Sequence, residues 1–326
     1  MTEQSLLNPD RKPTLAGVER AAEKISAILP RTPLLPLEID GQIIWCKAEP
    51  LQPIGAFKIR GGWHRLTDLD EMQRRSGVVA FSSGNHAQGV AWAAKKLGIP
   101  ATIVMPEDAP ATKMANTRAL GASVVTYDRM TGSREQLAEE LAAKTGATVV
   151  PSFDDPWIVE GQGSCGIELR EQIIEQTGNA PDQIVACCGG GGLAAGIALS
   201  NPDSEVMVAE PEGWDDMRRS LELGRIVPVE DNPPATRCDA LQTLEVAPIT
   251  FDILARRGVT GVAITPREVE HAMRLAFERL HLCVEPGGAV ALAAIVSGKV
   301  SATPETVVTL SGGNVDRQLF AEILTG

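Results

Sequence analysis

The sequence predicts an α/β protein with two doubly wound parallel sheets, and three observations support this prediction. Apolar strand-like segments alternate with helix-like segments along most of the 326 residues, a pattern typical of parallel sheets covered by helices. Glycine or proline stands at the end of many of these segments. The chain is long enough for two domains of ordinary size, so two sheets explain the alternation better than one very wide sheet.

The first series of elements covers residues 78–150. Gly98 and Gly121 should end its first two helices and Pro106 its second strand, because both residue types interrupt regular structure. We expect strands at 78–81, 101–105, 123–126 and 148–150, and helices at 87–97, 111–120 and 134–145.

The second series begins near Pro156. A polar, proline-rich connection at 228–236 interrupts it. Because ligands of doubly wound sheets bind beyond the carboxyl ends of the strands, the loops at 82–86, 189–192, 210–216 and 311–314 are the informative ones. We expect helices at 160–177, 193–199, 266–280 and 288–296, and strands at 183–188, 205–209 and 306–310.

Composition and charge exclude several classes of protein. The net charge of −12 and the aromatic content of 4% argue against a nucleic-acid partner. No uncharged apolar run of about 18 residues exists and the N-terminus is polar, so we expect neither a membrane span nor a signal peptide. The six cysteines form no C-x-x-C pair, which favours reduced thiols in a cytoplasmic enzyme.

Four consecutive glycines indicate an anion site, most simply for a phosphate. They lie between a strand and a helix, where bare backbone and free N–H groups can meet a ligand. A dinucleotide is one candidate, because Gly189-x-Gly191-x-x-Ala194 loosely fits its fingerprint and Glu210 follows at about 20 residues. A Walker loop is excluded because no Gly-Lys-Ser/Thr follows. Alternatively, the glycines have a purely structural role and let the helix pack tightly against the strand.

A second feature is a lysine in a turn rich in apolar residues and glycine. Lys58 lies within the segment 53–62, at the entry to a helix. A lone lysine is usually a solvated surface charge, but partial burial would lower its pKa and free the amine as a nucleophile. A reactive amine beside a phosphate cradle is what an aldehyde phosphate cofactor requires.

Five motifs in order give the chain its resemblance to a known family. The chain resembles the pyridoxal-phosphate enzymes of the tryptophan-synthase β type (fold type II), most of all the branch of serine/threonine dehydratases, hydroxyaspartate dehydratases and serine racemases. The resemblance runs from about Arg31 to Asp316 and favours pyridoxal phosphate over a dinucleotide. The motifs are Phe57-Lys58-x-Arg60-Gly61, the run 82–89 (SSGNHAQG), the glycine run with Leu193, Glu285-Pro286-x-Gly288-Ala289, and the run 311–314 (SGGN).

The resemblance implies a role for each motif. Lys58 would hold the cofactor covalently and then remove the α-proton of the substrate, and Ser311 would meet the pyridine nitrogen. Further cofactor contacts are implied for Phe57, Asn85 and Glu285, and the cofactor phosphate would lie on Gly189, Gly190, Gly191, Gly192 and Leu193. The substrate would bind at Ser82, Ser83, Gly84, Asn85 and His86, although Ser83 and Asn85 are also suited simply to cap the following helix.

The acidic loop after the strand at 205–209 is a candidate metal site. By resemblance, Glu210, Asp216 and the main-chain oxygen of Trp214 would hold a divalent cation. Such oxygen ligands suit Mg²⁺ or Mn²⁺. The alternative is a solvated acidic loop in an acidic protein.

Three departures or variable positions bear on the substrate. Ile54, Gly55 and Ala56 replace the polar residues that usually precede Phe-Lys in the family. Ser83 matches the second acid/base of serine racemases and keeps racemisation as an alternative. By resemblance, Arg134 lies where an arginine of the racemases approaches the mouth of the active site. It could bind a distal carboxylate, as in 3-hydroxyaspartate, or it is an ordinary charge at the start of a helix. The loop 236–243 should border the substrate side.

The sequence therefore predicts a cytoplasmic homodimeric ammonia-lyase dependent on pyridoxal phosphate, with a small amino acid as substrate. It would convert serine, threonine or 3-hydroxyaspartate into a 2-oxo acid and ammonia. The alternatives are a racemase of the same family and, more remotely, an NAD-type oxidoreductase or a non-catalytic binding protein. We expect residues 1–76 and 152–326 to form a large cofactor-binding domain, residues 77–151 a small substrate-binding domain, and the active site to lie in the cleft between them.

Overall fold

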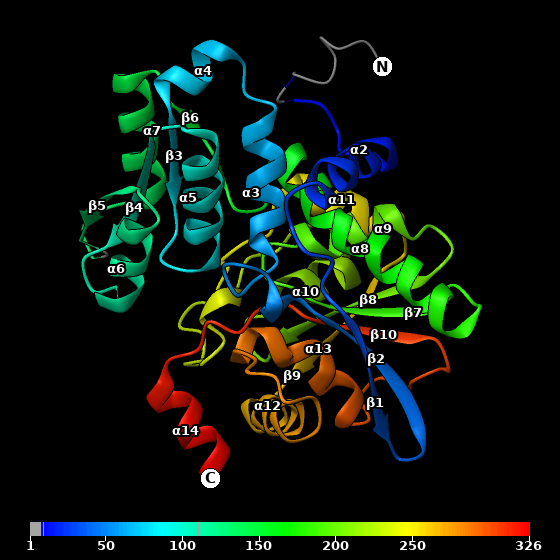
Figure 1. Ribbon diagram of the computed structural model, residues 1–326. Coiled ribbons are helices and arrows are strands. Elements are labelled where there is room, and N and C mark those ends of the chain that lie inside the picture. The colour runs from blue at the N-terminus through cyan, green and yellow to red at the C-terminus, as the bar shows by residue number, and fades with distance from the viewer. Residues whose placement is uncertain (1–7, 9, 110, 129) are drawn as a thin grey trace.

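The computed structural model describes residue 8 and residues 10–326 except 110 and 129. Its strands form two separate sheets surrounded by helices (Figure 1). The larger sheet has the order β1 (Leu34–Ile39), β2 (Gln42–Ala48), β10 (Thr306–Leu310), β7 (Gln183–Cys187), β8 (Glu205–Pro211), β9 (Thr260–Ile264), and the smaller has the order β5 (Ser123–Tyr127), β4 (Ala101–Pro106), β3 (Val78–Phe81), β6 (Thr148–Val149).

The smaller sheet is parallel throughout, as predicted. Side chains alternate between its two faces along β3. Val78 and Ala80 pack with α5 (Asn85–Leu97), whereas Val79 packs with α7 (Arg134–Thr145). A third helix, α6 (Ala111–Ala119), contacts β5 and α5. The predicted strands and helices of this region are confirmed, with α5 beginning two residues earlier than expected.

The larger sheet differs from the predicted all-parallel sheet at one edge. Strand β1 pairs antiparallel with β2, and only the remaining pairs are parallel. The two strands are joined by Asp40 and Gly41, which have φ angles of 51° and 81°. Positive φ at both central residues is the geometry of a tight hairpin turn. This hairpin was not predicted from the sequence, because its strands mix polar and apolar residues.

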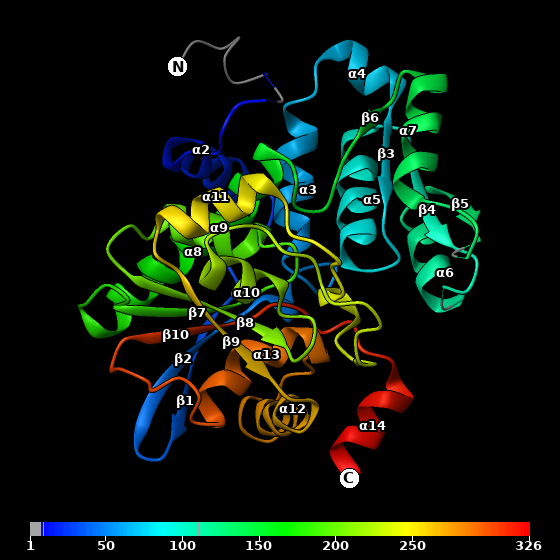
Figure 2. The ribbon, with the colours of Figure 1, turned by 180° about the vertical axis from the view of Figure 1, so that it is seen from behind.

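Helices cover both faces of the larger sheet (Figures 1 and 2). One face is covered by α8 (Pro156–Thr177), α9 (Gly192–Ser200) and α11 (Pro248–Arg256), the other by α12 (Pro266–Leu280) and α13 (Pro286–Val296). Helices α8 and α13 begin at prolines, before the predicted starts, because proline is compatible with the first helical position. Elements without a prediction are α2 (Leu15–Ser26), α4 (Glu71–Ser76), α10 (Asp216–Leu223), α11, α14 (Arg317–Thr325), β9 and the short helices η1 (Glu49–Leu51) and η2 (Asp239–Leu241).

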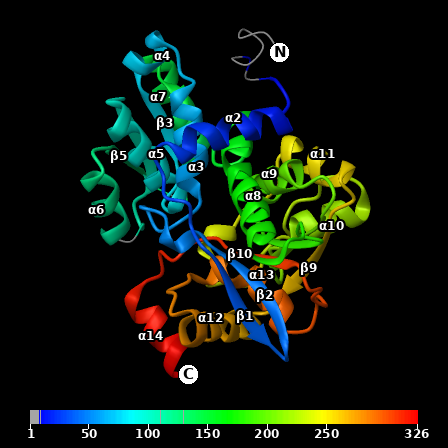
Figure 3. The ribbon, with the colours of Figure 1, turned by 45° about the vertical axis from the view of Figure 1, so that its right-hand side comes forward.

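Helix α3 (Lys58–Thr67) lies between the two sheet units, with α5 on one side and α8 on the other (Figure 3). Glycines allow this close approach. A Cβ on Gly62 would lie 3.0 Å from the Gly89 backbone, and one on Gly161 would lie 2.6 Å from Gly61 Cα. The rigid contact therefore fixes the start of α3 relative to both sheets. Within the described residues, no helix combines the length and apolar character that a membrane crossing needs.

Candidate active site

Lys58 is the first residue of α3, and its amine is turned toward a main-chain oxygen. Its Nζ donates a hydrogen bond to the Ser152 carbonyl at 2.8 Å and lies 5.1 Å from the centre of the Phe57 ring. Burial lowers the pKa of Lys58 to about 8, because the ammonium form loses its hydration. The reactive neutral amine is thus accessible at a lower pH than in an exposed lysine.

The glycine run forms a tight loop between β7 and α9, close to the Lys58 amine. Gly191 has a φ of 84°, and a Cβ on Gly190 would lie 2.2 Å from the Phe153 ring. The Gly190 carbonyl accepts a hydrogen bond of 2.8 Å from Thr250 Oγ1. Segment 152–153 therefore contacts both Lys58 and the glycine loop. The first-turn N–H groups of α9 have no partner within the helix, which is the condition for binding an anion.

The loop after β3 brings the smaller sheet into the same site. Asn85 begins α5, and its Nδ2 donates to Glu285 Oε1 at 2.6 Å. The Asn85 Oδ1 accepts from Asn314 Nδ2 at 2.8 Å. Burial, with a further contribution from Asp239, raises the pKa of Glu285 to about 7. Three of the five sequence motifs thus meet through their side chains.

The loop after β10 joins the Lys58 segment through its main chain. The Phe57 N–H donates to the Ser311 carbonyl at 3.1 Å, and the Gly313 N–H donates to the Gly55 carbonyl at 2.8 Å. Ser311 is buried. The structure thus brings the Lys58, 82–89, 285–289 and 311–314 motifs together through these contacts.

Two predicted substrate residues have other partners. The Nε2 of His86 lies 2.8 Å from the Val150 carbonyl, and burial lowers the pKa of His86 to about 3, so its ring is neutral. Arg134 Nε donates to Glu135 Oε1 at 2.7 Å, and its guanidinium lies 5.8 Å from the Phe81 ring centre. Arg134 is therefore next to the 82–84 loop but already paired. Substrate contact by either residue remains a prediction.

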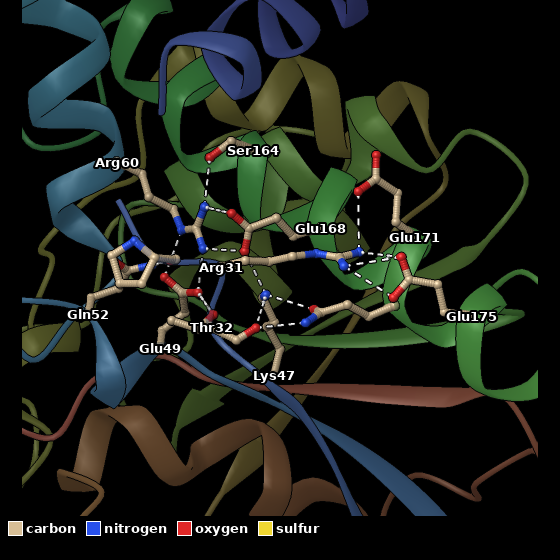
Figure 4. Close-up of polar contacts among 12 residues, drawn as sticks. Arg31, Thr32, Lys47, Glu49, Gln52, Arg60, Ser164, Glu168, Glu171 and Glu175 are labelled. Carbon is tan, nitrogen blue, oxygen red and sulfur yellow. Dashed lines mark hydrogen bonds and ion pairs between the residues drawn. The ribbon is translucent and has the colours of Figure 1, made fainter. Parts of the chain in front are cut away.

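A buried charged network around Arg60, in the first turn of α3, was not predicted from the sequence (Figure 4). Arg60 is completely buried and donates hydrogen bonds of 2.7–2.8 Å to both Glu49 and Glu168. Lys47 Nζ donates to Glu168 Oε2 at 2.7 Å. The network ties β2, η1 and α8 to the first turn of α3, two residues beyond Lys58. A sequence signal existed, because Arg60 belongs to the Lys58 motif.

The acidic loop after β8 holds two buried carboxylates. Glu210 accepts main-chain hydrogen bonds from Met217 at 3.2 Å and Arg218 at 2.8 Å. Both carboxylate oxygens of Asp216 are buried without a hydrogen-bond partner in the described structure. Burial raises the pKa of Asp216 to about 7 and that of Glu210 well above its usual value, the latter also because Asp216 is near. No cluster of three or more His, Cys, Asp or Glu side chains suited to a metal occurs among the described residues.

The sequence matches the family described as "Pyridoxal-phosphate dependent enzyme" over residues 25–312. An L-threo-3-hydroxyaspartate ammonia-lyase from Pseudomonas sp. is 41% identical over 319 residues, covering 95% of this chain and 98% of that protein. A serine racemase from Schizosaccharomyces pombe is 36% identical, covering 96% and 98%. The crystal structure of a threonine deaminase from T.th. is 40% identical, with a TM-score of 0.86, covering 93% and 99%.

The chain belongs to the pyridoxal-phosphate dependent enzyme family. It is a pyridoxal-phosphate dependent lyase with the fold shared by threonine deaminase and serine racemase. The dinucleotide interpretation is thereby set aside, and the structure gives the physical reason. The Glu210 carboxylate, which would have met a ribose, is buried and occupied by two main-chain N–H groups.

The residues present fit the family cofactor. Lys58 offers a partly buried amine of lowered pKa. The loop from Gly189 to Gly192 leads into the N-terminus of α9. At Gly190 a side chain would clash with the Phe153 ring, so the backbone there is bare. Segment 152–153 thus contacts both Lys58, whose amine could bind the cofactor aldehyde, and the glycine loop, which could bind the cofactor phosphate.

Proposed function

We propose that this lyase dehydrates small β-hydroxy amino acids, among them 3-hydroxyaspartate, serine and threonine, to 2-oxo acids and ammonia. The observation that carries the proposal is the position of the Lys58 amine, whose charge is felt both by Cys188, directly before the glycine run, and by His86 in the first turn of α5. The names of the relatives support the substrate class, because they include ammonia-lyases for hydroxyaspartate and threonine.

The chain's own groups account for the steps of a β-elimination. The main-chain N–H groups of Ser83 to Ala87 at the start of α5 would bind the substrate α-carboxylate, and Lys58 would take the α-proton. When bound, pyridoxal phosphate supplies a covalent link to the substrate nitrogen and an electron sink for the bond to the α-proton. The β-hydroxyl leaves as water after protonation. The released enamine tautomerises to an imine, which water hydrolyses to the 2-oxo acid and ammonia.

Ser83 favours racemisation as the second candidate activity. It is half-buried in the loop between β3 and α5, where a hydroxyl could exchange a proton with the face of the substrate opposite Lys58. Serine racemases among the relatives support this alternative.

We propose that the Glu210 loop binds a Mg²⁺ or Mn²⁺ ion. Two buried carboxylates close together require either protons or a cation, and the free oxygens of Asp216 are suited to a hard cation. Glu210, Asp216 and the main-chain oxygen of Trp214 would hold it. Its role would be structural, because α10 begins at Asp216 and Met217 packs against the glycine loop.

The remaining assignments rest on the sequence and the family. We propose that residues 77–151 form the substrate-binding domain and that residues 1–76 and 152–326 form the cofactor-binding domain. We further propose a homodimer that acts in the cytoplasm.

The experiment that tests the proposed function measures products. The protein loaded with pyridoxal phosphate is incubated with serine, threonine and the diastereomers of 3-hydroxyaspartate, and 2-oxo acid, ammonia and the product inverted at Cα are quantified. Release of 2-oxo acid and ammonia in equal amounts supports the dehydratase. Appearance of the product inverted at Cα (D-serine from L-serine, the α-epimer from the other substrates) without ammonia would instead support a racemase. Ser83→Ala should reduce inversion at Cα more than it reduces elimination.

A further inference from the structure

An ion pair joins the two sheet units at the edge of the active site. Lys113 Nζ, on α6 of the smaller unit, contacts Asp239 Oδ2, at the start of η2. The two residues are 126 positions apart in the sequence. In Figures 1 and 2 the yellow segment that contains η2 lies toward α6, below the lower end of α5.

The η2 segment is part of the wall of the site. A Cβ on Gly189 would lie 3.2 Å from Leu241 Cα, and one on Gly287 would lie 3.3 Å from Ala240 Cβ. Hence η2 packs against both the glycine loop and the start of α13, whose first turn follows Glu285. The ion pair is thereby held beside the groups that would bind cofactor and substrate.

Both charges of the pair lie near Glu285. Asp239 raises and Lys113 lowers the pKa of Glu285, the partner of Asn85. The Lys113 side chain is 24% exposed, whereas that of Asp239 is 51% exposed. The ammonium is thus the more enclosed partner, and the carboxylate is the one that solvent or a competing anion can replace.

We propose that Lys113 binds the distal carboxylate of a dicarboxylic β-hydroxy amino acid, and that Asp239 holds the ammonium in place until such a substrate arrives. The inference rests on the proposed function and names its preferred substrate class. The α-carboxylate of the substrate would lie at the start of α5. The second carboxylate of the substrate would then replace Asp239 as the partner of Lys113, with no covalent change. Lys113 suits this role better than Arg134, which is paired with Glu135 and packed on Phe81.

The test compares substrates of different charge on the holoenzyme. In Lys113→Met, the ratio of kcat/KM for 3-hydroxyaspartate to kcat/KM for threonine should fall about 10- to 100-fold, as expected for losing one charge-assisted contact. Lys113→Arg should keep most of the preference. Lys144→Met, at an exposed lysine of the same unit, should leave the ratio unchanged. The proposal would be overturned if this kcat/KM ratio were the same in Lys113→Met as in the wild type. It would also be overturned if Lys144→Met lowered the ratio as much as Lys113→Met does.

A binding measurement separates this inference from the proposed function. Succinate has the carbon chain and both carboxylates of aspartate without the amine, and butyrate lacks the distal charge. Calorimetry on the holoenzyme should show that Lys113→Met weakens succinate binding about 10-fold or more, whereas Asp239→Asn strengthens it. Butyrate binding should be the same in wild type and Lys113→Met. Equal succinate affinity in wild type and Lys113→Met would overturn the inference even if the lyase activity is present. Absence of lyase activity with the predicted succinate pattern would overturn the proposed function alone.

Discussion

The ammonium form of Lys58 loses hydration where its Nζ meets the Ser152 carbonyl, and this loss lowers its pKa to about 8. The sequence predicted the direction of this shift from the apolar and glycine-rich surroundings of the lysine. It could not supply the contact itself, because Ser152 is 94 positions away in the chain. Similarly, the sequence placed Arg134 near the substrate but could not show that Glu135 and Phe81 already occupy its guanidinium.

At the residue scale, the shift predicts how cofactor loading depends on pH. Only the neutral amine attacks an aldehyde, so the loading rate of cofactor-free protein should rise with pH through about 8 and then level off. An exposed lysine would continue to gain reactivity up to about pH 10.4. The measurement is the growth of the visible absorbance band after pyridoxal phosphate is mixed with the protein at a series of pH values. A midpoint above about pH 10 would show that Lys58 titrates like an exposed lysine.

Helix α3 depends on the charged network that binds its first turn. The side chains of Arg60, Glu49 and Lys47 are completely buried, whereas Arg31 at the outer end of the cluster is 40% exposed (Figure 4). Buried charges are tolerated only when each is paired, because an unpaired one keeps the full cost of lost hydration. The network therefore makes the position of Lys58 sensitive to any change in Arg60.

At the element scale, Arg60→Met and Arg31→Met should differ strongly. Removing Arg60 leaves the buried Glu49 carboxylate without its cationic partner, with only the Thr32 hydroxyl still donating to it, and leaves Glu168 with Lys47 alone. This change should lower the free energy of unfolding by about 3–5 kcal/mol. Removing Arg31 breaks exposed pairs with Glu171 and Glu175 and should cost at most about 1 kcal/mol. Urea denaturation followed by circular dichroism measures both. Equal losses would show that the network does not stabilise this part of the fold.

On the scale of the whole molecule, the order of strands and helices along the chain could largely be predicted from the sequence. The contacts between segments far apart in the chain could not. Strands such as 101–106 and 306–310 are short, apolar and bounded by turn residues, so their sequences indicate them directly. The β1–β2 hairpin mixes polar and apolar residues at a sheet edge, which hides it from the same pattern. The family resemblance placed segment 236–243 beside the substrate, but the contact of η2 with the glycine loop depends on packing between distant segments, and no local signal specifies it.

A divalent cation should stabilise the whole molecule through the Glu210 loop. Mg²⁺ at about 100 times its Kd should add about 2.7 kcal/mol to the free energy of unfolding, because it binds only the folded protein. A chelator should reverse this gain. Asp216→Asn should lose the effect, whereas Glu212→Gln, at an exposed carboxylate of the same loop, should retain it. Thermal unfolding at fixed pH measures the shift, and a melting temperature indifferent to Mg²⁺ and Mn²⁺ would remove the proposed site.

The assignment of Lys58 as the residue that carries the cofactor can be tested by trapping the covalent bond between the two. The holoenzyme is reduced with borohydride, digested and analysed by mass spectrometry. We expect a pyridoxyl phosphate group on the peptide that contains Lys58, and its absence from Lys58→Ala. Modification of a different lysine in the wild-type protein, or no modified lysine at all, would contradict this assignment.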